Sequence, residues 1–339
     1  MFRFEITEEL EDERIDKCLS ALIDSLSRSY IQRMIKENGV AVNGTAVKGS
    51  YRVKAEDVVT FELPPAQEPD IEPENIPLDI LYEDKDVIVV NKPKGMVVHP
   101  AAGHYSGTLV NALMYHCGSE LSGINGVLRP GIVHRIDRDT TGSIIACKND
   151  TAHGSIAAQL KEHSITRRYS AICHGVMKEN EGTVDKPIGR HPTERKKMAV
   201  NERNGKRAVT HYRVLERFHD FTYIECVLET GRTHQIRVHM AAIGHPLLGD
   251  EVYAGSAAKA QCARIRQLLQ RRYSALPGLR PGSQGLSGAA SQESVCPESL
   301  LQGQTLHARI LGFLHPSTGE YVEAEAPLPE YFKQLLEIL

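Results

Sequence analysis

The hydrophobic positions of the N-terminal segment repeat with helical spacing and then alternate as in strands. In residues 14–24, and again after Ser27, apolar side chains recur every three or four positions, which is typical of amphipathic helices. Gly39 can cap the second helix at its C-terminus. The following Val40-Ala41-Val42 leads into Asn43-Gly44, a turn signal of β-hairpins. The segment therefore predicts two short helices and a small hairpin sheet.

Beyond residue 78 the pattern is mostly one of strands. Apolar or β-branched runs predict strands at 86–90, 143–147, 168–173, 208–215 and 221–228. Helical patterns occupy 109–115 and about 150–163, and a further helix runs from Thr233, with Ile236, Met240 and Ile243 apolar, to Gly244. Strands interspersed with occasional helices predict an α+β fold with a mixed, largely antiparallel sheet.

Two compositional breaks divide the chain. Residues 64–78 hold five prolines among acidic residues, and proline at this density disfavours both helix and sheet. We therefore expect a small domain at 1–63, a linker at 64–78 and a larger domain at 79–339. Within the larger domain, residues 256–302 begin with helical potential and become rich in Gly, Ser, Gln and Pro. This composition predicts a mobile insertion.

The overall composition is that of an ordinary globular protein, with 41% hydrophobic and 24% charged residues. No apolar run approaches the roughly 20 residues of a membrane span, and the acidic N-terminus lacks the apolar segment of a secretory signal. Seven cysteines without a C-x-x-C pair argue against a disulfide framework and a zinc ribbon. We expect a reduced cytoplasmic monomer with no membrane partner.

The net charge of −3 conceals a strong local polarity. Residues 25–54 and 186–213 are basic, whereas residues 55–88 are acidic apart from Lys85. Two basic regions on either side of an acidic one are typical of a protein that binds a polyanion at two places. Solvated faces that merely alternate in sign are the alternative.

The densest polar cluster is the run H-R-I-D-R-D-T-T-G at 134–142, just before a predicted strand. Asp137 lies close to Arg135 and Arg138, and such neighbours keep a carboxylate ionised. An ionised carboxylate suits nucleophilic or electrostatic work at an electron-poor carbon. A salt-bridge network within the loop is the alternative. A metal site is not expected, because the arginines would repel a divalent cation and no H-E-x-x-H arrangement is present.

Two further runs carry candidate site residues. In G-R-T-H-Q-I-R-V-H-M, His234 and Arg237 are three positions apart on the predicted helix and so share a face. Arg237 is then a natural charge partner for Asp137, although a surface arginine on an amphipathic helix would give the same pattern. The run from Thr166 to Ala171 places Tyr169 at the start of a strand, either as a core aromatic or as a ring that faces the site.

The N-terminal module resembles the RNA-binding domain of ribosomal protein S-four, the alpha-L motif. The likeness rests on R-x-D-x-x-L from Arg14, the basic second helix from Ser27, and the V-N-G turn. In that family the second helix faces RNA, which implies phosphate contacts for Arg28, Arg33 and Lys36. A helix–hairpin module for protein interaction is the alternative.

The larger domain is similar to the RluA/RluD family of pseudouridine synthases. The four motifs that carry the likeness occur in family order: N-K-P-K-G-M-V-V-H-P from Asn91, the 134–142 cluster, R-R-Y-S-A from Arg167, and the G-R-T-H run. Together with the N-terminal module, they point to the branch that acts on large-subunit ribosomal RNA. The sequence departs from the family in Ile136 for leucine, in Arg167 for lysine, and in the length of 256–302.

The resemblance implies an RNA pseudouridine synthase that works without metal or cofactor. Such enzymes break the N-glycosidic bond of a uridine, turn the uracil and join C5 to C1′. The residues suit either addition of the aspartate to the sugar or removal of its 2′ proton. A stacked uridine hides both carbons, so the base must first be flipped out.

The same resemblance assigns roles to individual residues. It makes Asp137 the catalytic aspartate, Tyr169 the ring that packs on the base, and Arg237 the ion-pair partner of the aspartate. RNA contacts are implied for Arg135, which fills the space of the flipped nucleotide, and expected for Arg167, Arg232 and His234. The alternatives are a non-catalytic RNA-binding or ribosome-assembly factor on the same fold, and a metal-dependent nuclease.

Overall fold

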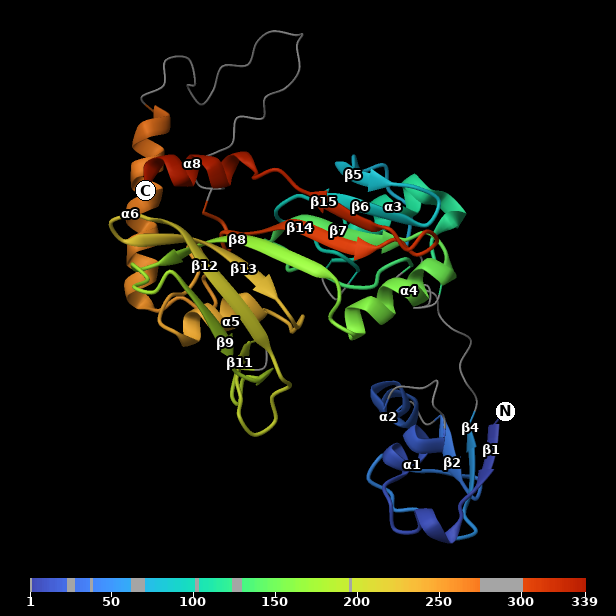
Figure 1. The fold of residues 1–339 in the computed structure, drawn as a ribbon. Helices are drawn as coiled ribbons and strands as arrows, with labels where there is room; N and C mark the ends of the chain where they lie inside the picture. The colour runs from blue at the N-terminus through green and yellow to red at the C-terminus, as the bar shows by residue number, and fades with distance from the viewer. Residues whose placement is uncertain are drawn as a thin grey trace. The chain divides into compact units, whose positions relative to one another are not determined.

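A computed structural model describes residues 2–22, 28–36, 39–61, 71–100, 104–123, 130–194, 197–274 and 301–339. The chain forms two compact units, Met1–Pro69 and Asp70–Leu339, each with a hydrophobic core of its own (Figure 1). The Gly/Ser-rich part of the expected insertion, 275–300, lies outside the described residues. So does the first part of the expected linker, 64–70.

Unit 1 combines a four-stranded antiparallel sheet with two helices. Its strand order is β1 (Phe2–Glu5), β4 (Val58–Phe61), β2 (Val40–Val42) and β3 (Thr45–Ala46). A 3₁₀ turn, η1 (Glu8–Leu10), precedes helices α1 (Ile15–Leu22) and α2 (Arg28–Lys36). Ile15, Leu19 and Ile31 from the helices are buried against Val40 and Val59 of the sheet. The predicted pair of helices and hairpin is confirmed.

The turn between β2 and β3 shows why the sequence specifies this hairpin. Asn43 and Gly44 both adopt positive φ angles, 50° and 81°. Asn and Gly tolerate this left-handed conformation better than other residues, and two such residues match the twist of the flanking strands. Asn43 also donates from Nδ2 to Asp57, which fixes the turn against the chain just before β4.

Unit 2 is built on a nine-stranded sheet in the order β5-β6-β7-β14-β8-β13-β12-β9, with β15 paired to β14 (Figure 1). The strands are β5 (Ile80–Glu83), β6 (Val87–Lys92), β7 (Thr141–Cys147), β8 (Thr166–His174), β9 (Glu181–Asp185), β12 (Val209–Arg217), β13 (Phe221–Leu228), β14 (Leu306–Leu314) and β15 (Tyr321–Glu325). A separate hairpin joins β10 (Ile188–Arg190) to β11 (Met198–Val200). Among the described strand pairs only β7 and β14 run parallel, so the predicted α+β fold with a mixed, largely antiparallel sheet is confirmed.

Helices cover both faces of this sheet. The helices of unit 2 are α3 (Leu109–Cys117), continued by η2 (Gly118–Glu120), then α4 (Asp150–Lys161), α5 (Gln235–Ala242), α6 (Ser256–Ser274) and α8 (Glu330–Ile338). α3 and α5 pack on one face, where alternate strand residues such as Ile88 and Ala171 point. α4, α6 and α8 pack on the other face, toward Val89 and Ile172. None of the helices in the described part of the chain has the length and apolar character of a membrane span.

Local signals set several of the helix starts. Thr108 caps α3 in a capping box with Asn111, and the Asn149 side chain caps α4 by accepting from the Ala152 N–H. The prediction that α5 includes His234 is wrong, because the helix begins at Gln235. His234 instead occupies the cap position with a φ of 57°.

The second half of the expected linker is held against unit 2. Residues 71–78 form neither helix nor strand, yet Ile71 is buried in the core beside α3. The Asn111 side chain donates to the carbonyl of Glu72, and the Asn111 carbonyl accepts from the Glu74 N–H.

The loop that carries the 134–142 cluster is fixed at its C-terminal end and in its middle. At the end, Gly142 has a φ of 106°, and a Cβ there would lie 2.2 Å from the Ala308 carbonyl oxygen. Only glycine therefore lets β7 and β14 pair at this point. In the middle of the loop, the Arg138 carbonyl accepts from the fully buried Lys92 ammonium, which also donates to the carbonyls of Pro93 and Met96. Lys92 thus ties the N-K-P-K-G run to the loop.

Candidate active site

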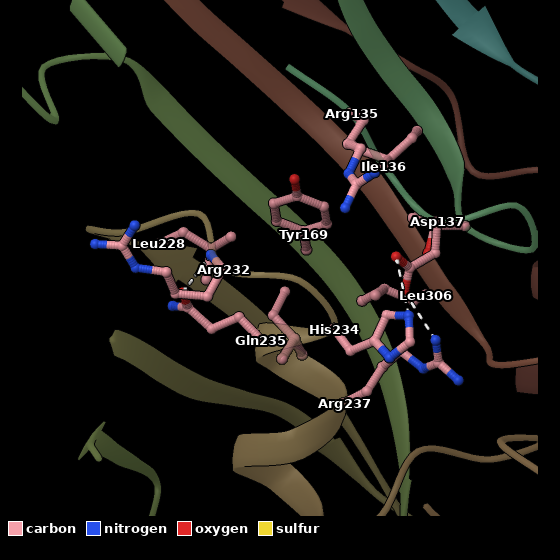
Figure 2. A pocket seen from close by; sticks show the side chains of 12 residues that line it. Arg135, Ile136, Asp137, Tyr169, Leu228, Arg232, His234, Gln235, Arg237 and Leu306 are labelled. Atoms are coloured by element: carbon pink, nitrogen blue, oxygen red, sulfur yellow. Dashed lines mark hydrogen bonds and ion pairs between the residues drawn. The ribbon is translucent and has the colours of Figure 1, made fainter. Parts of the chain in front are cut away.

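Six of the predicted site residues line a single pocket of unit 2 (Figure 2). They come from the loop before β7, from β8, and from the turn and first residues of α5. The full lining is Arg135, Ile136, Asp137, Thr140, Tyr169, Leu228, Arg232, His234, Gln235, Ile236, Arg237 and Leu306. The chain thus brings together its three most polar sequence motifs at one place on the sheet.

Asp137 and Arg237 meet in this pocket. Arg237 Nη1 donates to Asp137 Oδ2 at 2.9 Å, and Figure 2 shows the carboxylate directed at the guanidinium. The Asp137 side chain is 24% exposed, whereas that of Arg237 is 7% exposed. The arginine is therefore part of the framework, and the carboxylate is the group that the pocket presents to a ligand.

A second carboxylate, Asp250, holds Arg237 in place. Arg237 donates from Nε and Nη2 to the two oxygens of Asp250, at 2.7 and 3.0 Å. Asp250 is fully buried and also accepts from the N–H groups of Val252 and Tyr253. Burial alone would lower the pKa of Arg237, but the hydrogen bonds and charge of Asp250, followed by Asp137, raise it. The guanidinium is permanently charged and fixed by a bidentate pair.

His234 completes the polar side of the pocket. Its Nε2 lies 3.8 Å from Asp137 Oδ1, beyond hydrogen-bond distance, and its Nδ1 lies 2.7 Å from the Tyr253 hydroxyl. Since that hydroxyl accepts from the Met198 N–H, it can donate its own proton to Nδ1. Burial lowers the pKa of His234, so a neutral ring faces Asp137 at neutral pH. The left-handed backbone at His234 turns the side chain into the pocket even though the residue precedes the helix.

Tyr169 supplies the aromatic surface. It is 8% exposed and shares the inner face of β8 with the site, next to Leu228 and Leu306 of the lining. Burial raises the pKa of the Tyr169 hydroxyl, so the ring is a neutral phenol at neutral pH. An aromatic plane beside a carboxylate is the arrangement that a flipped base requires for stacking.

The remaining predicted RNA-contacting residues fall in three places. Arg135 is exposed and donates weakly to Thr233 Oγ1, at 3.4 Å, while Arg232 donates from Nε to the Arg207 carbonyl. Arg167 does not line the pocket but a neighbouring groove. In unit 1, Lys36 is exposed on α2, and the side chains of Arg28 and Arg33 on the same helix lie outside the described residues.

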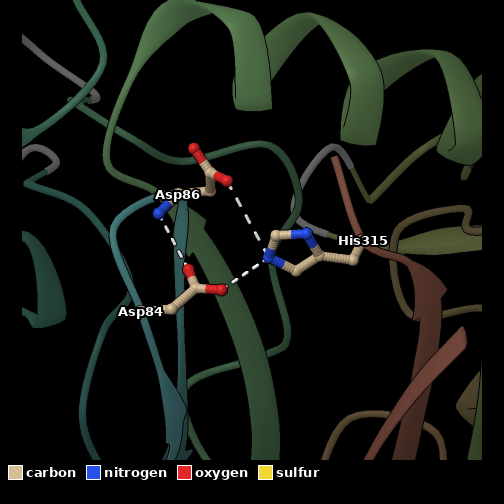
Figure 3. A group of neighbouring side chains, drawn as sticks. All are labelled: Asp84, Asp86 and His315. Atoms are coloured by element: carbon tan, nitrogen blue, oxygen red, sulfur yellow. Dashed lines mark hydrogen bonds and ion pairs between the residues drawn. The ribbon is translucent and has the colours of Figure 1, made fainter. Parts of the chain in front are cut away.

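One cluster of metal-ligand types occurs elsewhere among the described residues, formed by Asp84, Asp86 and His315 (Figure 3). Its ligand atoms are already in use. Asp84 accepts from the N–H groups of Asp86 and Val87, from the Tyr82 hydroxyl and from His315 Nε2. His315 Nδ1 is approached by the N–H groups of Ser317 and Thr318. These contacts make the cluster a structural network that joins β5, β6 and the turn after β14.

Several residues that line the pocket or hold its lining in place were not predicted from the sequence. Asp250 and Tyr253 follow α5 in a turn, and Gln235 fixes the G-R-T-H turn by accepting from the Arg232 N–H and donating to the Val209 carbonyl. No local signal marked Asp250, which follows the apolar Leu247-Leu248 after Gly249. A charge that follows an apolar pair and becomes fully buried must have a partner, and Arg237 is the partner found here.

Comparisons with known proteins show the family of the chain. The family model described as RNA pseudouridylate synthase matches residues 86–242, and that of the S4 domain matches residues 13–59. The chain is 49% identical to the "Uncharacterized RNA pseudouridine synthase YlyB" of Bacillus subtilis, over 98% of this chain and 96% of that protein. It is 44% identical to the "Ribosomal large subunit pseudouridine synthase D" of Zymomonas mobilis, again over 98% and 96%.

Solved structures agree on the fold. The human RNA Pseudouridylate Synthase Domain Containing 1 superposes with a TM-score of 0.53 at 24% identity, over 78% of this chain and 95% of that one. At this identity the likeness concerns the fold alone.

Proposed function

This chain belongs to the RNA pseudouridylate synthase family, and we propose that it isomerises specific uridines of large-subunit ribosomal RNA with Asp137 as the catalytic carboxylate. One observation carries the assignment of the residue. Asp137 Oδ2 accepts a single hydrogen bond, from a fixed guanidinium, and Oδ1 has no donor within hydrogen-bond distance among the described residues. A carboxylate oxygen without a donor is therefore available in a pocket that has an aromatic wall.

The reaction can be followed on the residues of the pocket. The target uridine leaves its stack and enters beside Tyr169, which brings C1′ toward Asp137. The C1′–N1 bond breaks, the uracil turns, and a C1′–C5 bond forms. The C5 proton is lost and N1 gains one, so the product is an isomer of the substrate. Arg237 keeps Asp137 oriented, because Asp250 prevents the guanidinium from moving.

Arginines at the rim offset the cost of flipping the base, which amounts to a few kcal/mol. Arg135 fills the space that the nucleotide leaves, and Arg232 and His234 line the same pocket. In unit 1, Arg28, Arg33 and Lys36 of α2 bind further phosphates. The basic run 186–213 adds its own contacts. Cations spread over two units suit a long, folded RNA.

The RNA class is inferred from the relatives. Proteins named ribosomal large subunit pseudouridine synthase D match at 40–44% identity over at least 96% of this chain. We take large-subunit ribosomal RNA as the substrate and the cytoplasm as the place of action. We also propose that the enzyme acts as a monomer. The family supports the enzyme and not a non-catalytic assembly factor.

The direct test is release of label from RNA. A large-subunit ribosomal RNA transcript labelled with tritium at uracil C5 should lose label with the wild-type protein in EDTA, because no step uses a metal. Asp137→Asn should release none. A small-subunit transcript serves as the control for substrate class. Tritium release that survives Asp137→Asn contradicts the catalytic role, and equal release from both transcripts contradicts the proposed substrate.

A further inference from the structure

Arg167 is a buried cation whose charge has no anionic partner among the described residues. It is 7% exposed and lies at the start of β8, on the face that also carries Tyr169. Its Nη2 donates to the Glu229 carbonyl at 3.1 Å, but its Nε is buried without a hydrogen-bond partner. No carboxylate of the described residues pairs with it, and burial lowers the pKa of Arg167. A buried charge left in this state is costly.

Other cations of unit 2 have partners for their charge. Lys94 Nζ, which is also buried without a hydrogen-bond acceptor, lies 4.1 Å from the centroid of the Tyr331 ring. Arg237 lies between two carboxylates, and Lys92 donates to three carbonyls. In the groove that Arg167 lines, Arg213 pairs with Glu225 at 3.0 Å. Arg167 differs from these cations in that, among the described residues, it has neither a carboxylate partner nor an acceptor for its Nε. A negatively charged ligand would complete its surroundings.

The groove leads toward the active site. Leu228 lines both the Asp137 pocket and the groove, which also includes Thr166, Arg168 and Glu229. Arg167 and Tyr169 are two residues apart on one face of a strand, a span of roughly 6.8 Å. The Arg167 guanidinium is therefore within one nucleotide of a base held against Tyr169.

The neighbouring chain leaves room for this guanidinium. A Cβ at Gly231 would lie 2.6 Å from Arg167 Nη1, so the glycine of the G-R-T-H run permits the observed position. The groove's two glutamates would not repel an anion strongly. Glu225 is paired with Arg213, and Glu229 is engaged by Arg207 and His211.

We propose that this groove is a subsite for a phosphodiester group of the substrate RNA, next to the flipped nucleotide, with Arg167 as its main ligand. The proposal rests on the proposed function, since it takes the base to be bound at Asp137. The planar fork of arginine matches the oxygens of a phosphate, and a charge-assisted bond to the guanidinium would supply the anionic partner that Arg167 lacks among the described residues. Arg168, exposed on the same strand, adds positive charge at the mouth.

A role of Arg167 in RNA binding and a role in stability predict opposite results for the Arg167→Met variant. Arg167→Met removes an unpaired buried charge, so its melting temperature should stay within about 2 °C of the wild type or rise. Its affinity for the large-subunit transcript should fall about tenfold or more at low salt. The slope of log K against log salt should become shallower by about 0.7 for one lost phosphate contact. Arg264→Met, which removes an exposed arginine of α6 that lines neither the pocket nor the groove, is the matched control and should match the wild type in all three measurements.

Single methylphosphonate linkages then locate the contact. The linkages are placed one at a time around the target uridine of a short RNA. At one position, the neutral linkage should weaken RNA binding by the wild type about tenfold and leave RNA binding by the Arg167→Met variant unchanged. Unchanged affinity and salt slope in Arg167→Met, or the same sensitivity to every linkage in both proteins, overturns the subsite. If Arg167→Met does not fold, Gly231→Ala, which displaces the guanidinium, replaces it. Binding that behaves as expected without tritium release would retain the subsite and reject the proposed function.

Discussion

Two carboxylate–histidine clusters of unit 2 look alike by composition and differ in what they can do. In the pocket, Asp137 lies beside His234 and Arg237. In the network at the sheet edge, Asp84 lies beside His315. The two aspartate side chains are almost equally exposed, 24% and 26%. Exposure therefore does not distinguish them.

The two aspartates differ in the number of hydrogen-bond donors around each carboxylate. Asp84 accepts from four donors, which occupy both of its oxygens. Asp137 accepts from one among the described residues. A carboxylate with filled lone pairs stabilises the fold, whereas one with an open oxygen can meet a substrate. A search for reactive carboxylates should accordingly count donors before it measures surface.

The largest expected effects come from removing the charge of Asp137 and that of Asp84 in turn. Asp137→Asn should lower tritium release at least about 10³-fold, equivalent to about 4 kcal/mol of transition-state stabilisation, with little change in melting temperature. Asp84→Asn should do the reverse, with an unfolding free energy lower by about 2 kcal/mol and a kcat near that of the wild type. Denaturant unfolding and single-turnover kinetics on both variants check this. Comparable losses of activity in the two would show that donor number does not separate them.

The next largest effect concerns the pair that orients Asp137. Arg237→Met leaves Asp250 buried without its cation, so the unfolding free energy should fall by about 3 kcal/mol. Activity should fall about 10²-fold, because Asp137 loses its fixed partner. The double variant Arg237→Met with Asp250→Asn removes the stranded charge. It should regain most of the stability and none of the activity, and recovery of both would contradict an orienting role for Arg237.

Much of the fold and of the site can be predicted from local sequence, and what cannot be predicted has a physical reason. The Asn43-Gly44 hairpin and the caps at Thr108 and Asn149 are encoded within four residues, and the structure has all of them. The pairing of Asp137 with Arg237, 100 positions apart, could be suggested because each lies in a dense polar run. Whether such runs meet depends on sheet order, which periodicity does not encode.

The strand β14 illustrates what was missed. It lies at the centre of the sheet between β7 and β8, yet no strand was predicted over Leu306–Leu314. Its apolar pattern is interrupted by His307, which is fully buried because Thr141 and the Ala326 carbonyl satisfy both ring nitrogens. Asp250 was missed for the same reason. A polar residue whose partner is distant in sequence cannot be recognised as buried from its neighbours.

The smallest expected effect is the pH dependence of the contribution that Asp84 makes to the unfolding free energy. Burial tends to raise the pKa of Asp84, but hydrogen bonds from the Val87 and Asp86 N–H groups, Tyr82 and His315 outweigh it and lower the pKa to about 2. A depressed carboxyl pKa stabilises the fold fully above the unfolded value, near 3.9, and this contribution is lost as pH falls toward 2. For a partly exposed group it amounts to about 1–2 kcal/mol. The difference in unfolding free energy between the wild type and Asp84→Asn should therefore shrink by that amount between pH 5 and pH 2.5, as measured by urea unfolding.

The Tyr82→Phe variant removes one of the four donors to Asp84. Its difference in unfolding free energy from the wild type should shrink over the same pH range by a fraction of that amount. A constant difference across this range would mean that the donors around Asp84 do not hold its charge, and the contrast with Asp137 would then need another cause.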